Sequence, residues 1–331
     1  MLRHNNSGMP PLSCIVSVAG TELTDHEKRF FERSNPLGFI LFSRNVDNRA
    51  QTAALVKSLK AVLGRECPIL IDQEGGRVAR LKPPHWHKIP SARELAADLA
   101  ELERQMDILA GDLSESSINV NCAPVMDVAT PQMHDVIGDR AYAWDPEIVY
   151  SCADIVCRSF LEKGVTPVIK HIPGHGRAEE DSHDALPVVR TDLETLCETD
   201  FIPFRKISSL DYADKLWAMT AHILFTEIDP HLPVSVSKTI IQDIIRTEIV
   251  FGGFLISDDL SMEGLAAAGS IGERGFACVE AGCDAALYCA GHLEDMEVLA
   301  QKLPPLSDEA CDRLYNSGFP LTSSKKISGV A

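Results

Sequence analysis

The sequence of 331 residues lacks the excess of positive charge that nucleic-acid-binding proteins carry. It holds 31 Lys and Arg residues against 48 Asp and Glu residues, and its formal net charge is −17 at pH 7. Binding to phosphate backbones needs a basic stripe, and binding to anionic membranes needs clusters of Lys and Arg, of which the sequence has no run. We therefore expect neither a nucleic acid nor a membrane as a partner.

Long hydrophobic runs are missing as well. No uncharged apolar stretch reaches the roughly 18 residues that a membrane-spanning helix needs, and residues 1–14 hold no continuous apolar region of the kind found in signal peptides. The ten cysteines include no C-x-x-C pair. Several lie within apolar or helical patterns, namely Cys122, Cys152, Cys157 and Cys278. Reduced thiols of cytosolic proteins are often buried in this way, so we expect a cytoplasmic location.

The sequence does contain a regular alternation of short apolar runs and helical patterns. Eight runs are rich enough in Val, Ile, Leu or Phe to form parallel strands that are buried on both faces. Eight such strands with helices between them predict an α/β fold, a single-domain (β/α)8 barrel of the TIM type. The runs cover residues 14–19, 38–42, 68–71, 118–128, 165–169, 216–221, 253–256 and 284–289.

The helical patterns and the ends of the chain complete this prediction. A doubly wound sheet is the alternative fold, but no G-x-G-x-x-G opens a helix. No repeat or linker divides the chain, so we expect one barrel domain over residues 1–320 and a flexible C-terminal tail over residues 321–331. Apolar residues at helical spacing cover residues 50–63, 91–114, 146–163, 193–208 and 237–248, and residues 292–317 form a last helical region that closes the barrel.

Ionisable residues gather after the carboxyl ends of the predicted strands. The active sites of (β/α)8 barrels are built from the loops at that end, so this distribution predicts a site there. Asp72, Glu74 and Arg80 follow the third strand, Lys170 and His171 the fifth, His222 the sixth and Asp258 the seventh. Asp127 stands at the end of the fourth run, and Arg140 follows it.

The stretch from residue 165 to residue 187 holds the densest chemistry. Three chemistries fit it: a metal site that uses His171, His175, Asp181 and His183, nucleophilic catalysis by Ser182, and general acid/base catalysis by His183 with Asp181 orienting it. The spacings match no familiar zinc pattern, and Ser182 lacks the glycines of a nucleophile elbow. The acid/base interpretation fits best, and it requires a partner carboxylate elsewhere.

Asp258 is the candidate for that carboxylate, because it should emerge at the mouth of the barrel. Its neighbour Asp259 can serve as the N-cap of the next helix. His222 ends a buried strand and is interpreted as a satisfied core histidine, and His175, between two glycines, as a residue that shapes its loop.

The remaining candidates have two interpretations each. Asp72 and Arg80 can bind sugar hydroxyls, or Asp72 and Glu74 can form surface ion pairs of little energetic value. Arg140 follows a glycine in a loop, where ligand binding and a solvated face are equally compatible with the sequence.

Four motifs, in this order along the chain, resemble glycoside hydrolase family 3. Within it they are most similar to the bacterial cytosolic β-N-acetylhexosaminidases that remove N-acetylglucosamine from anhydromuropeptides during cell-wall recycling. The motifs are Asp72-Gln73-Glu74-Gly75-Gly76-Arg77-Val78, Lys170-His171-Ile172-Pro173-Gly174-His175-Gly176, Asp181-Ser182-His183 and Ser257-Asp258-Asp259-Leu260-Ser261-Met262-Glu263-Gly264.

The resemblance implies a retaining mechanism without a metal or an organic cofactor, acting on a small carbohydrate or muropeptide substrate. Asp258 matches the nucleophile, which would form a glycosyl-enzyme intermediate. His183, held by Asp181, matches the general acid/base. We expect a monomer. The positions that contact the terminal sugar in such enzymes match Asp72, Arg80, Arg140, Lys170 and His171.

Two departures from the family pattern are visible. Ile172 stands where Phe is usual, and Asp139 stands where Glu is common, next to the retained Arg140. Two other functions remain open: a phosphorylase that passes the same intermediate to phosphate, and a catalytically silent sugar-binding barrel.

Overall fold

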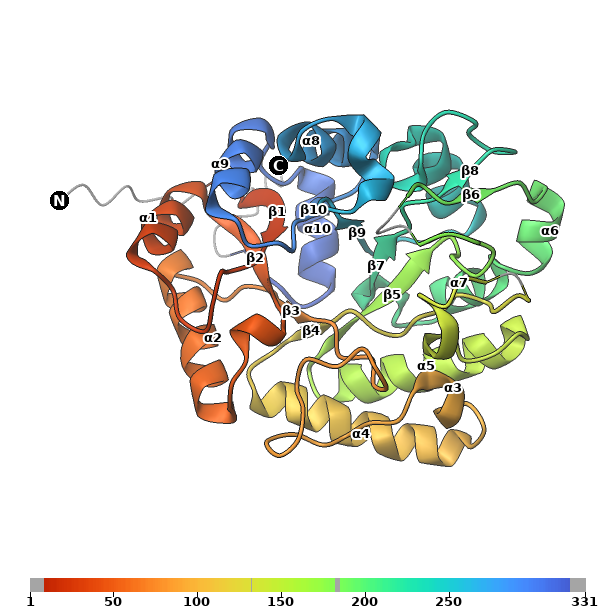
Figure 1. The fold of residues 1–331 in the computed structure, drawn as a ribbon, viewed down its shortest axis with the longest axis horizontal. Helices are drawn as coiled ribbons and strands as arrows, with labels where there is room; N and C mark the ends of the chain where they lie inside the picture. Colours follow the sequence, from red (N-terminus) through yellow and green to blue (C-terminus); the bar gives the residue numbers. More distant parts are fainter. Residues whose placement is uncertain (1–8, 132, 182–184, 322–331) are drawn as a thin grey trace, which may run out of the picture.

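The structure is a computed structural model, and it describes residues 9–131, 133–181 and 185–321. The eight predicted strands are present and form a closed parallel barrel in the order β1-β10-β9-β7-β5-β4-β3-β2 (Figure 1). The prediction of a (β/α)8 barrel is therefore confirmed. The barrel strands are β1 (Leu12–Val16), β2 (Pro36–Leu41), β3 (Ile69–Ile71), β4 (Val120–Asn121), β5 (Thr166–Ile172), β7 (Trp217–Thr220), β9 (Phe254–Asp259) and β10 (Ala285–Leu287).

Helices cover the outside of the barrel. Two predicted helical segments are each divided in two: Asp98 caps a new helix by accepting hydrogen bonds from the backbone N–H groups of Ala100 and Glu101, and Pro203 starts another, where its missing N–H costs nothing. The helices are α1 (Asp25–Ser34), α2 (Arg49–Leu63), α3 (Ala92–Leu95), α4 (Leu99–Glu115), α5 (Pro146–Glu162), α6 (Leu193–Glu198), α7 (Ile202–Ser208), a π-helical segment (Ile240–Glu248), α8 (Ile271–Ala281), α9 (Leu293–Lys302) and α10 (Asp308–Asn316).

Three strands differ from the predicted ones in ways that affect the open end of the barrel. The fifth and seventh strands run beyond their apolar stretches, so that Lys170 and His171 lie inside β5 and Asp258 lies inside β9. Polar side chains can occupy these strand positions because they line the cavity at the open end of the barrel. The fourth strand is much shorter than predicted. Ala123-Pro124 interrupts it, since proline cannot donate a ladder hydrogen bond.

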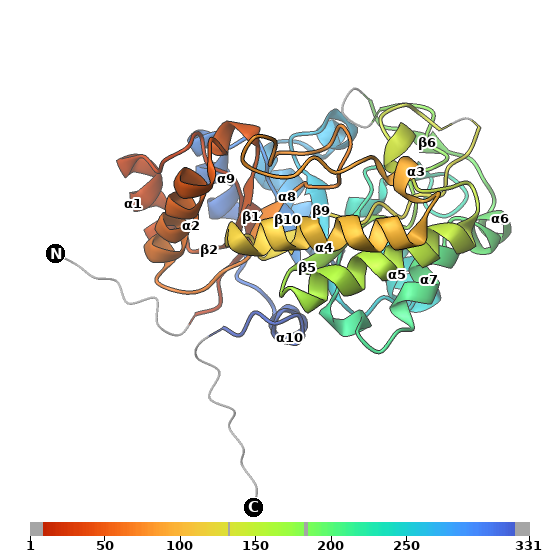
Figure 2. The same ribbon diagram turned by 90° about the horizontal axis from the view of Figure 1, so that it is seen from below.

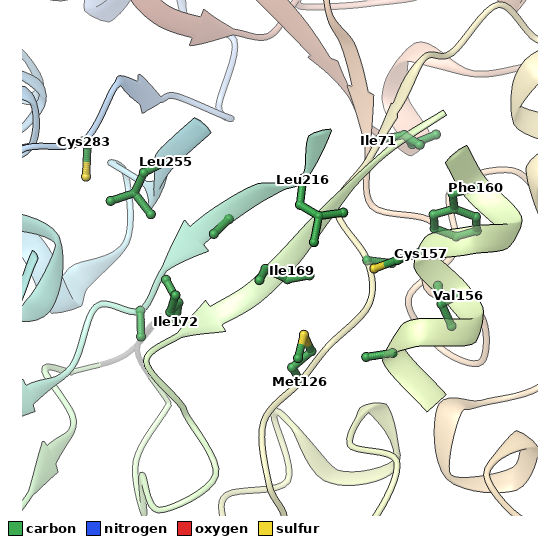
Figure 3. Packing of buried hydrophobic residues seen from close by; sticks show 14 of the residues in the cluster. Ile71, Met126, Val156, Cys157, Phe160, Ile169, Ile172, Leu216, Leu255 and Cys283 are labelled. Carbon is green, nitrogen blue, oxygen red and sulfur yellow. The ribbon is translucent and has the colours of Figure 1, made fainter. Parts of the chain in front are cut away.

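The apolar core has two layers. One lies between the strands and the surrounding helices, and Figure 3 shows Cys157 and Phe160 of α5 in it together with Ile71 and Ile169 of the barrel. The other fills the barrel itself. A fully buried side chain such as Phe160 stabilises the fold by about 1.5–3 kcal/mol, so this layer stabilises the scaffold that carries the strand ends.

The amino end of the barrel is closed by α10. Leu306, Ala310 and Leu314 pack into the same cluster as Trp217 and the other side chains inside the barrel, and the indole Nε1 of Trp217 donates a hydrogen bond to Ser317 Oγ at 2.9 Å. Figure 2 shows α10 at one end of the barrel, below the strands in that view. The predicted closing role of this helical region is confirmed.

The loops after β5 and β7 meet beyond the barrel in a two-stranded parallel sheet of β6 (Val188–Val189) and β8 (Leu224–Phe225). Among the described residues, none of the helices combines the length and the apolar character needed to cross a bilayer. The predicted C-terminal tail lies outside the described residues, apart from Leu321.

Candidate active site

A cavity of about 260 Å³ opens at the carboxyl end of the barrel. Ligand pockets for drug-sized molecules span about 300–1,000 Å³, so this cavity suits one small ligand. Six of the eight predicted site residues line it: Asp72, Arg80, Arg140, Lys170, His171 and Asp258. Asp181 belongs to the loop after β5 and is not among the lining residues that the structure describes, while His183 lies outside the described residues.

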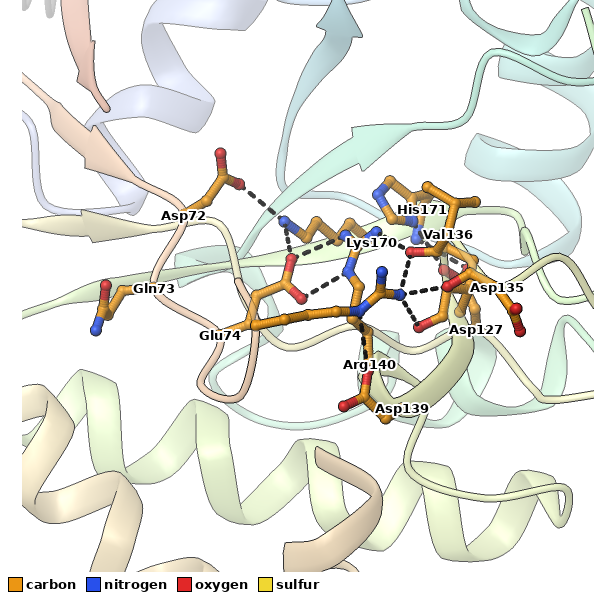
Figure 4. Close-up of polar contacts among 12 residues, drawn as sticks. Asp72, Gln73, Glu74, Asp127, Asp135, Val136, Asp139, Arg140, Lys170 and His171 are labelled. Carbon is orange, nitrogen blue, oxygen red and sulfur yellow. Dashed lines mark hydrogen bonds and ion pairs between the residues drawn. The ribbon is translucent and has the colours of Figure 1, made fainter. Parts of the chain in front are cut away.

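The floor of the cavity is built around Lys170, whose side chain is 3% exposed. Its Nζ lies 2.9 Å from Asp72 Oδ1 and 2.6 Å from Glu74 Oε1 (Figure 4). Burial alone would lower the pKa of Lys170, but the charges of Asp72 and Glu74 outweigh it and raise that pKa above the ordinary lysine value. The ammonium therefore stays charged.

Arg140 forms the second cation of the floor. Its Nε and Nη2 donate to the two carboxylate oxygens of Glu74 at 2.8 and 2.9 Å, and its Nη1 donates to the carbonyl oxygen of Val136 at 3.0 Å. A bidentate pair of this kind fixes the guanidinium in both position and orientation. Of the two interpretations that the sequence left open for Arg140, the solvated face is wrong, because the side chain is 13% exposed.

Arg80 is held less tightly. Its Nη2 lies 3.4 Å from Asp72 Oδ2, and its guanidinium lies 5.4 Å from the centre of the Phe42 ring. Its Nε is buried and has no hydrogen-bond partner among the described residues. The backbone N–H of Arg80 donates to Gln73 Oε1 at 2.7 Å, so Gln73 shapes the turn that presents Arg80 to the cavity.

Asp127 lies beneath His171 and organises the turn that follows β5. Its Oδ2 lies 2.8 Å from His171 Nδ1, and its Oδ1 accepts from the backbone N–H groups of His171 and His175 at 3.1 and 2.8 Å. The turn also packs closely at Gly176, where a Cβ would lie 1.7 Å from the carbonyl oxygen of Val128. Burial alone would raise the pKa of Asp127, but the charge and the hydrogen bonds of His171 lower it below the ordinary value. Asp127 is therefore a carboxylate.

His175 and His222 are both buried, although the sequence suggested burial only for His222. Burial, reinforced by the nearby His171, lowers the pKa of His175 to about 4, so its imidazole is neutral at pH 7. His222 Nδ1 lies 2.7 Å from Ser235 Oγ and its Nε2 lies 3.0 Å from the carbonyl oxygen of Asp259. The interpretation of His222 as a satisfied core histidine is confirmed.

Asp258 projects from the end of β9 into the cavity. Burial alone would raise its pKa, but the neighbouring His171, His222 and Lys170 and the backbone N–H of Asp259, which lies 2.8 Å from Asp258 Oδ1, hold the pKa below its ordinary value. Asp258 is therefore an anion inside a small cavity.

Asp259 has the predicted structural role but not as a helix cap. Its side chain accepts hydrogen bonds from the backbone N–H groups of Ser261 and Cys289 at 3.1 and 3.0 Å, and the following 3₁₀ segment Glu263–Ala268 is preceded by Met262. Asp259 therefore ties the turn after β9 to the end of β10.

Glu74 and Asp127 are the two carboxylates whose importance the sequence did not reveal. Both were visible after predicted strands, but a surface ion pair remained an equally good interpretation of Glu74. Only the tertiary fold brings Glu74 to Arg140 and Asp127 to His171, from segments 66 and 44 residues away.

Within residues 9–131, 133–181 and 185–321, no group of three or more His, Cys, Asp or Glu side chains is placed to hold a metal ion. The predicted acid/base pair includes His183, which lies outside the described residues, so the pair stays a prediction. The expectation of a metal-free site also stays a prediction.

Comparison with known proteins gives consistent matches along the chain. The model of the glycosyl hydrolase family 3 N-terminal domain matches residues 16–313. A beta-hexosaminidase of Idiomarina loihiensis is 34% identical over 320 residues, which cover 95% of this chain and 94% of that protein.

Solved structures of the same fold include the following two. NagZ from Neisseria gonorrhoeae, in complex with N-trifluoroacetyl-D-glucosamine, is 30% identical and superposes with a TM-score of 0.84 over 93% of this chain and 90% of that chain. A family 3 β-N-acetylglucosaminidase from Paenibacillus sp. is 29% identical with a TM-score of 0.84; the match covers 96% of this chain but only 64% of that longer chain.

Proposed function

The chain belongs to glycosyl hydrolase family 3, and we propose that it is a retaining β-N-acetylglucosaminidase whose nucleophile is Asp258. A nucleophilic carboxylate must be deprotonated and must reach the anomeric carbon of the sugar. Asp258 meets the first condition because its pKa is held below the ordinary value, and it lines the cavity into which a sugar would fit. This observation carries the proposal.

The surrounding groups are suited to the hydroxyl and acetamido groups of one sugar. Lys170, Arg140 and Arg80 offer charged N–H donors, and Asp72, whose side chain is 16% exposed, offers carboxylate acceptors. Buried charged groups of both signs recognise a polyhydroxylated ligand because each hydroxyl can donate one hydrogen bond and accept others. We propose that these residues and His171 hold the terminal sugar above Asp258.

For the general acid/base we propose His183, with Asp181 orienting it. A general acid works best with a pKa near the working pH. Burial alone would raise the pKa values of Glu74 and Asp127, but their cationic and histidine partners outweigh it and lower both. These carboxylates are therefore poor proton donors at neutral pH. A histidine on the loop after β5 supplies the missing group.

In the proposed reaction, Asp258 attacks the anomeric carbon while His183 gives its proton to the leaving oxygen. A glycosyl ester of Asp258 forms and the glycosidic bond breaks. His183 then removes a proton from water, which displaces Asp258 and restores both groups. The net configuration at the anomeric carbon is retained.

The proposed substrates are muropeptide fragments that end in N-acetylglucosamine, cleaved in the cytoplasm by a monomer during cell-wall recycling. This part of the proposal rests on the motifs that the chain shares with family 3 and on the beta-hexosaminidase and NagZ names of its relatives.

The test is hydrolysis of an aryl N-acetyl-β-glucosaminide and of the matching aryl β-glucoside, with Asp258→Ala as the negative control. Rapid release from the acetamido sugar alone, lost in the variant, is the expected result. Running the reaction in phosphate buffer also distinguishes free N-acetylglucosamine, the hydrolase product, from its 1-phosphate. No release from either glycoside by the folded protein would contradict the proposal and favour a sugar-binding barrel.

A further inference from the structure

We propose that Glu74 is a positioning residue that fixes Lys170 and Arg140 in the geometry needed to bind the terminal sugar, without contacting the sugar through hydrogen bonds of its own. The inference deepens the proposed function and rests on it. Glu74 differs from Asp72, the carboxylate that the motifs suggest as a sugar contact. Cations lie within 2.9 Å of both Glu74 oxygens, whereas Asp72 Oδ2 has only the longer 3.4 Å contact with Arg80.

The contacts of Glu74 account for this occupation. Oε1 lies 2.6 Å from Lys170 Nζ and 2.9 Å from Arg140 Nη2, while Oε2 lies 2.8 Å from Arg140 Nε. The side chain is only 6% exposed. Figure 4 shows Glu74 between the two cations, with dashed lines to each.

The backbone of Glu74 is fixed as firmly as its side chain. Its N–H donates to the carbonyl oxygen of Val78 at 2.9 Å, which closes the tight turn after β3. Gly75 has φ +102°, and a Cβ at that position would lie 2.5 Å from the carbonyl oxygen of Pro90. Glycine is required there, and the turn therefore directs Glu74 toward the floor of the cavity.

Counting donors shows what Glu74 leaves for a ligand. An ammonium has three N–H donors and a guanidinium has five. Contacts with the described residues direct two donors of Lys170 to Asp72 and Glu74, and three donors of Arg140 to Glu74 and Val136. One N–H of Lys170 and two of Arg140 remain, and the partners already bound set the directions of these free donors.

The charge of Glu74 is as important as its geometry. Lys170 and Arg140 are both buried and both positive, and each opposes the charge of the other. Glu74 is the anion that they share. Without it, the two cations would repel each other across the floor. Lys170 could then turn toward Asp258 and Arg140 toward Asp72, and both would lose their places against the sugar.

A matched control exists in the same chain. Asp284 is 4% exposed and lies between Arg246 and Arg313, at 3.1 and 2.6 Å, at the amino end of β10. It is also a buried carboxylate held by two cations, but it lines neither the cavity nor the turn after β3. Asp284→Asn therefore reproduces the loss of one buried charge without touching the proposed sugar site.

The experiment compares Glu74→Gln with Asp284→Asn. Binding of N-acetylglucosamine is measured by calorimetry, hydrolysis of the aryl N-acetyl-β-glucosaminide gives KM and kcat, and thermal unfolding shows that each variant is folded. Hydrogen bonds between charged groups are worth enough that Glu74→Gln should raise Kd and KM by about 10- to 100-fold. The groups that Glu74 positions bind the sugar both before and during the reaction, so kcat should fall by less than KM rises. Asp284→Asn should leave Kd and KM unchanged.

A double-mutant cycle separates positioning from a general structural role. If Glu74 acts through Arg140, then Glu74→Gln should raise Kd further by less than about 3-fold in an Arg140→Met background. Full additivity of the two effects, or an unchanged Kd in a folded Glu74→Gln protein, would overturn the proposal.

If Glu74→Gln fails to fold, Arg140→Lys decides instead. Lysine keeps the charge but cannot form the two-pronged contact with Glu74, so Kd should still rise at least 10-fold, and an unchanged Kd would contradict the inference. Failure of the proposed function is distinguished by the unmodified protein, which in that case would release no product at all.

Discussion

The two ends of the barrel contain the same arrangement of charges and use it differently. At the amino end, Asp284 lies between Arg246 and Arg313; at the carboxyl end, Glu74 lies between Arg140 and Lys170. A buried carboxylate held by two cations does not by itself mark a functional site.

The difference lies in what the cations have left to offer. Arg246 directs its remaining contacts to the carbonyl oxygens of Phe251 and Gly253, at 2.9 and 2.8 Å, and Asp284 Oδ2 also accepts from the backbone N–H of Leu255. At the amino end, backbone groups thus use the hydrogen-bonding capacity that the ion pairs leave on Arg246 and Asp284. At the carboxyl end, Lys170 and Arg140 keep donors beside a cavity that also holds Asp258. A functional site is therefore marked by buried charged groups that keep free hydrogen-bond donors next to a cavity.

The largest expected effect comes from Asp258. Asp258→Ala should lower kcat for the aryl N-acetyl-β-glucosaminide by at least about 10⁴-fold, because removal of a nucleophile abolishes the covalent route. Steady-state kinetics on freshly purified protein measures it. Asp284→Asn is the control at the other end, and a kcat for Asp258→Ala within 10-fold of the unmodified enzyme would remove Asp258 from the mechanism.

The reverse pattern is expected for Asp284. Asp284→Asn leaves Arg246 and Arg313 without their anion, and breaking a buried ion pair by removing one partner typically costs about 3–5 kcal/mol. Urea unfolding should show a loss of this size, with kcat/KM of the folded protein unchanged at low temperature. A large loss of kcat/KM in folded Asp284→Asn protein would mean that the two ends are coupled.

Asp127 should affect activity through His171. Asp127→Asn replaces the acceptor beside His171 Nδ1 and weakens the two backbone contacts of the same carboxylate. Partners that orient a functional histidine typically change activity by about 10- to 100-fold or more, so kcat/KM should fall by about 100-fold. The matched change Asp200→Asn removes the partner of Arg177, at 2.7 Å, at a position that does not line the cavity, and should have a smaller effect.

The smallest expected effect is a pH dependence of stability that arises at the carboxyl end. His175 has a pKa of about 4 in the folded protein and about 6.5 when unfolded. Its contribution is fully present above pH 6.5 and is lost as the pH falls towards 4, because the unfolded chain then binds a proton that the folded chain excludes.

Between pH 6 and pH 5 this amounts to about 1.4 kcal/mol per pH unit at most. Urea unfolding at both pH values should show that the free energy of unfolding falls more between pH 6 and pH 5 for the unmodified protein than for His175→Gln. An equal change in the free energy of unfolding for both proteins would show that His175 makes no contribution in this pH range. Below pH 4, loss of the paired carboxylates Glu74 and Asp127, whose folded pKa values are lowered, should lower stability further.

The sequence predicted the barrel and most of the candidate site because both depend on local pattern. Apolar runs of strand length specified the eight strands, and Asp72, Lys170 and Asp258 stand directly at their ends, so the barrel geometry alone brings them to one cavity. They lie together because all the strands are parallel and have their carboxyl ends at the same end of the barrel.

What the sequence could not predict depends on partners far away in the chain. Glu74 and Asp127 differ from ordinary loop carboxylates only through Arg140 and His171, which the fold brings to them. The helix-cap interpretation of Asp259 failed for a similar reason, since its side chain bonds to Cys289 across two strand ends as well as to its own turn. The predicted ends of the fifth and seventh strands were wrong as well, because polar residues at an open barrel end remain within the strand.

The most direct test of the proposed mechanism is to look for the glycosyl-enzyme. Protein quenched with acid during turnover of an activated aryl N-acetyl-β-glucosaminide is digested and mapped by mass spectrometry. The proposed mechanism predicts the added mass of one N-acetylglucosaminyl group on the peptide that contains Asp258, and none on the peptide that contains Asp284. An adduct on a different residue, or rapid turnover that inverts the anomeric configuration, would contradict it.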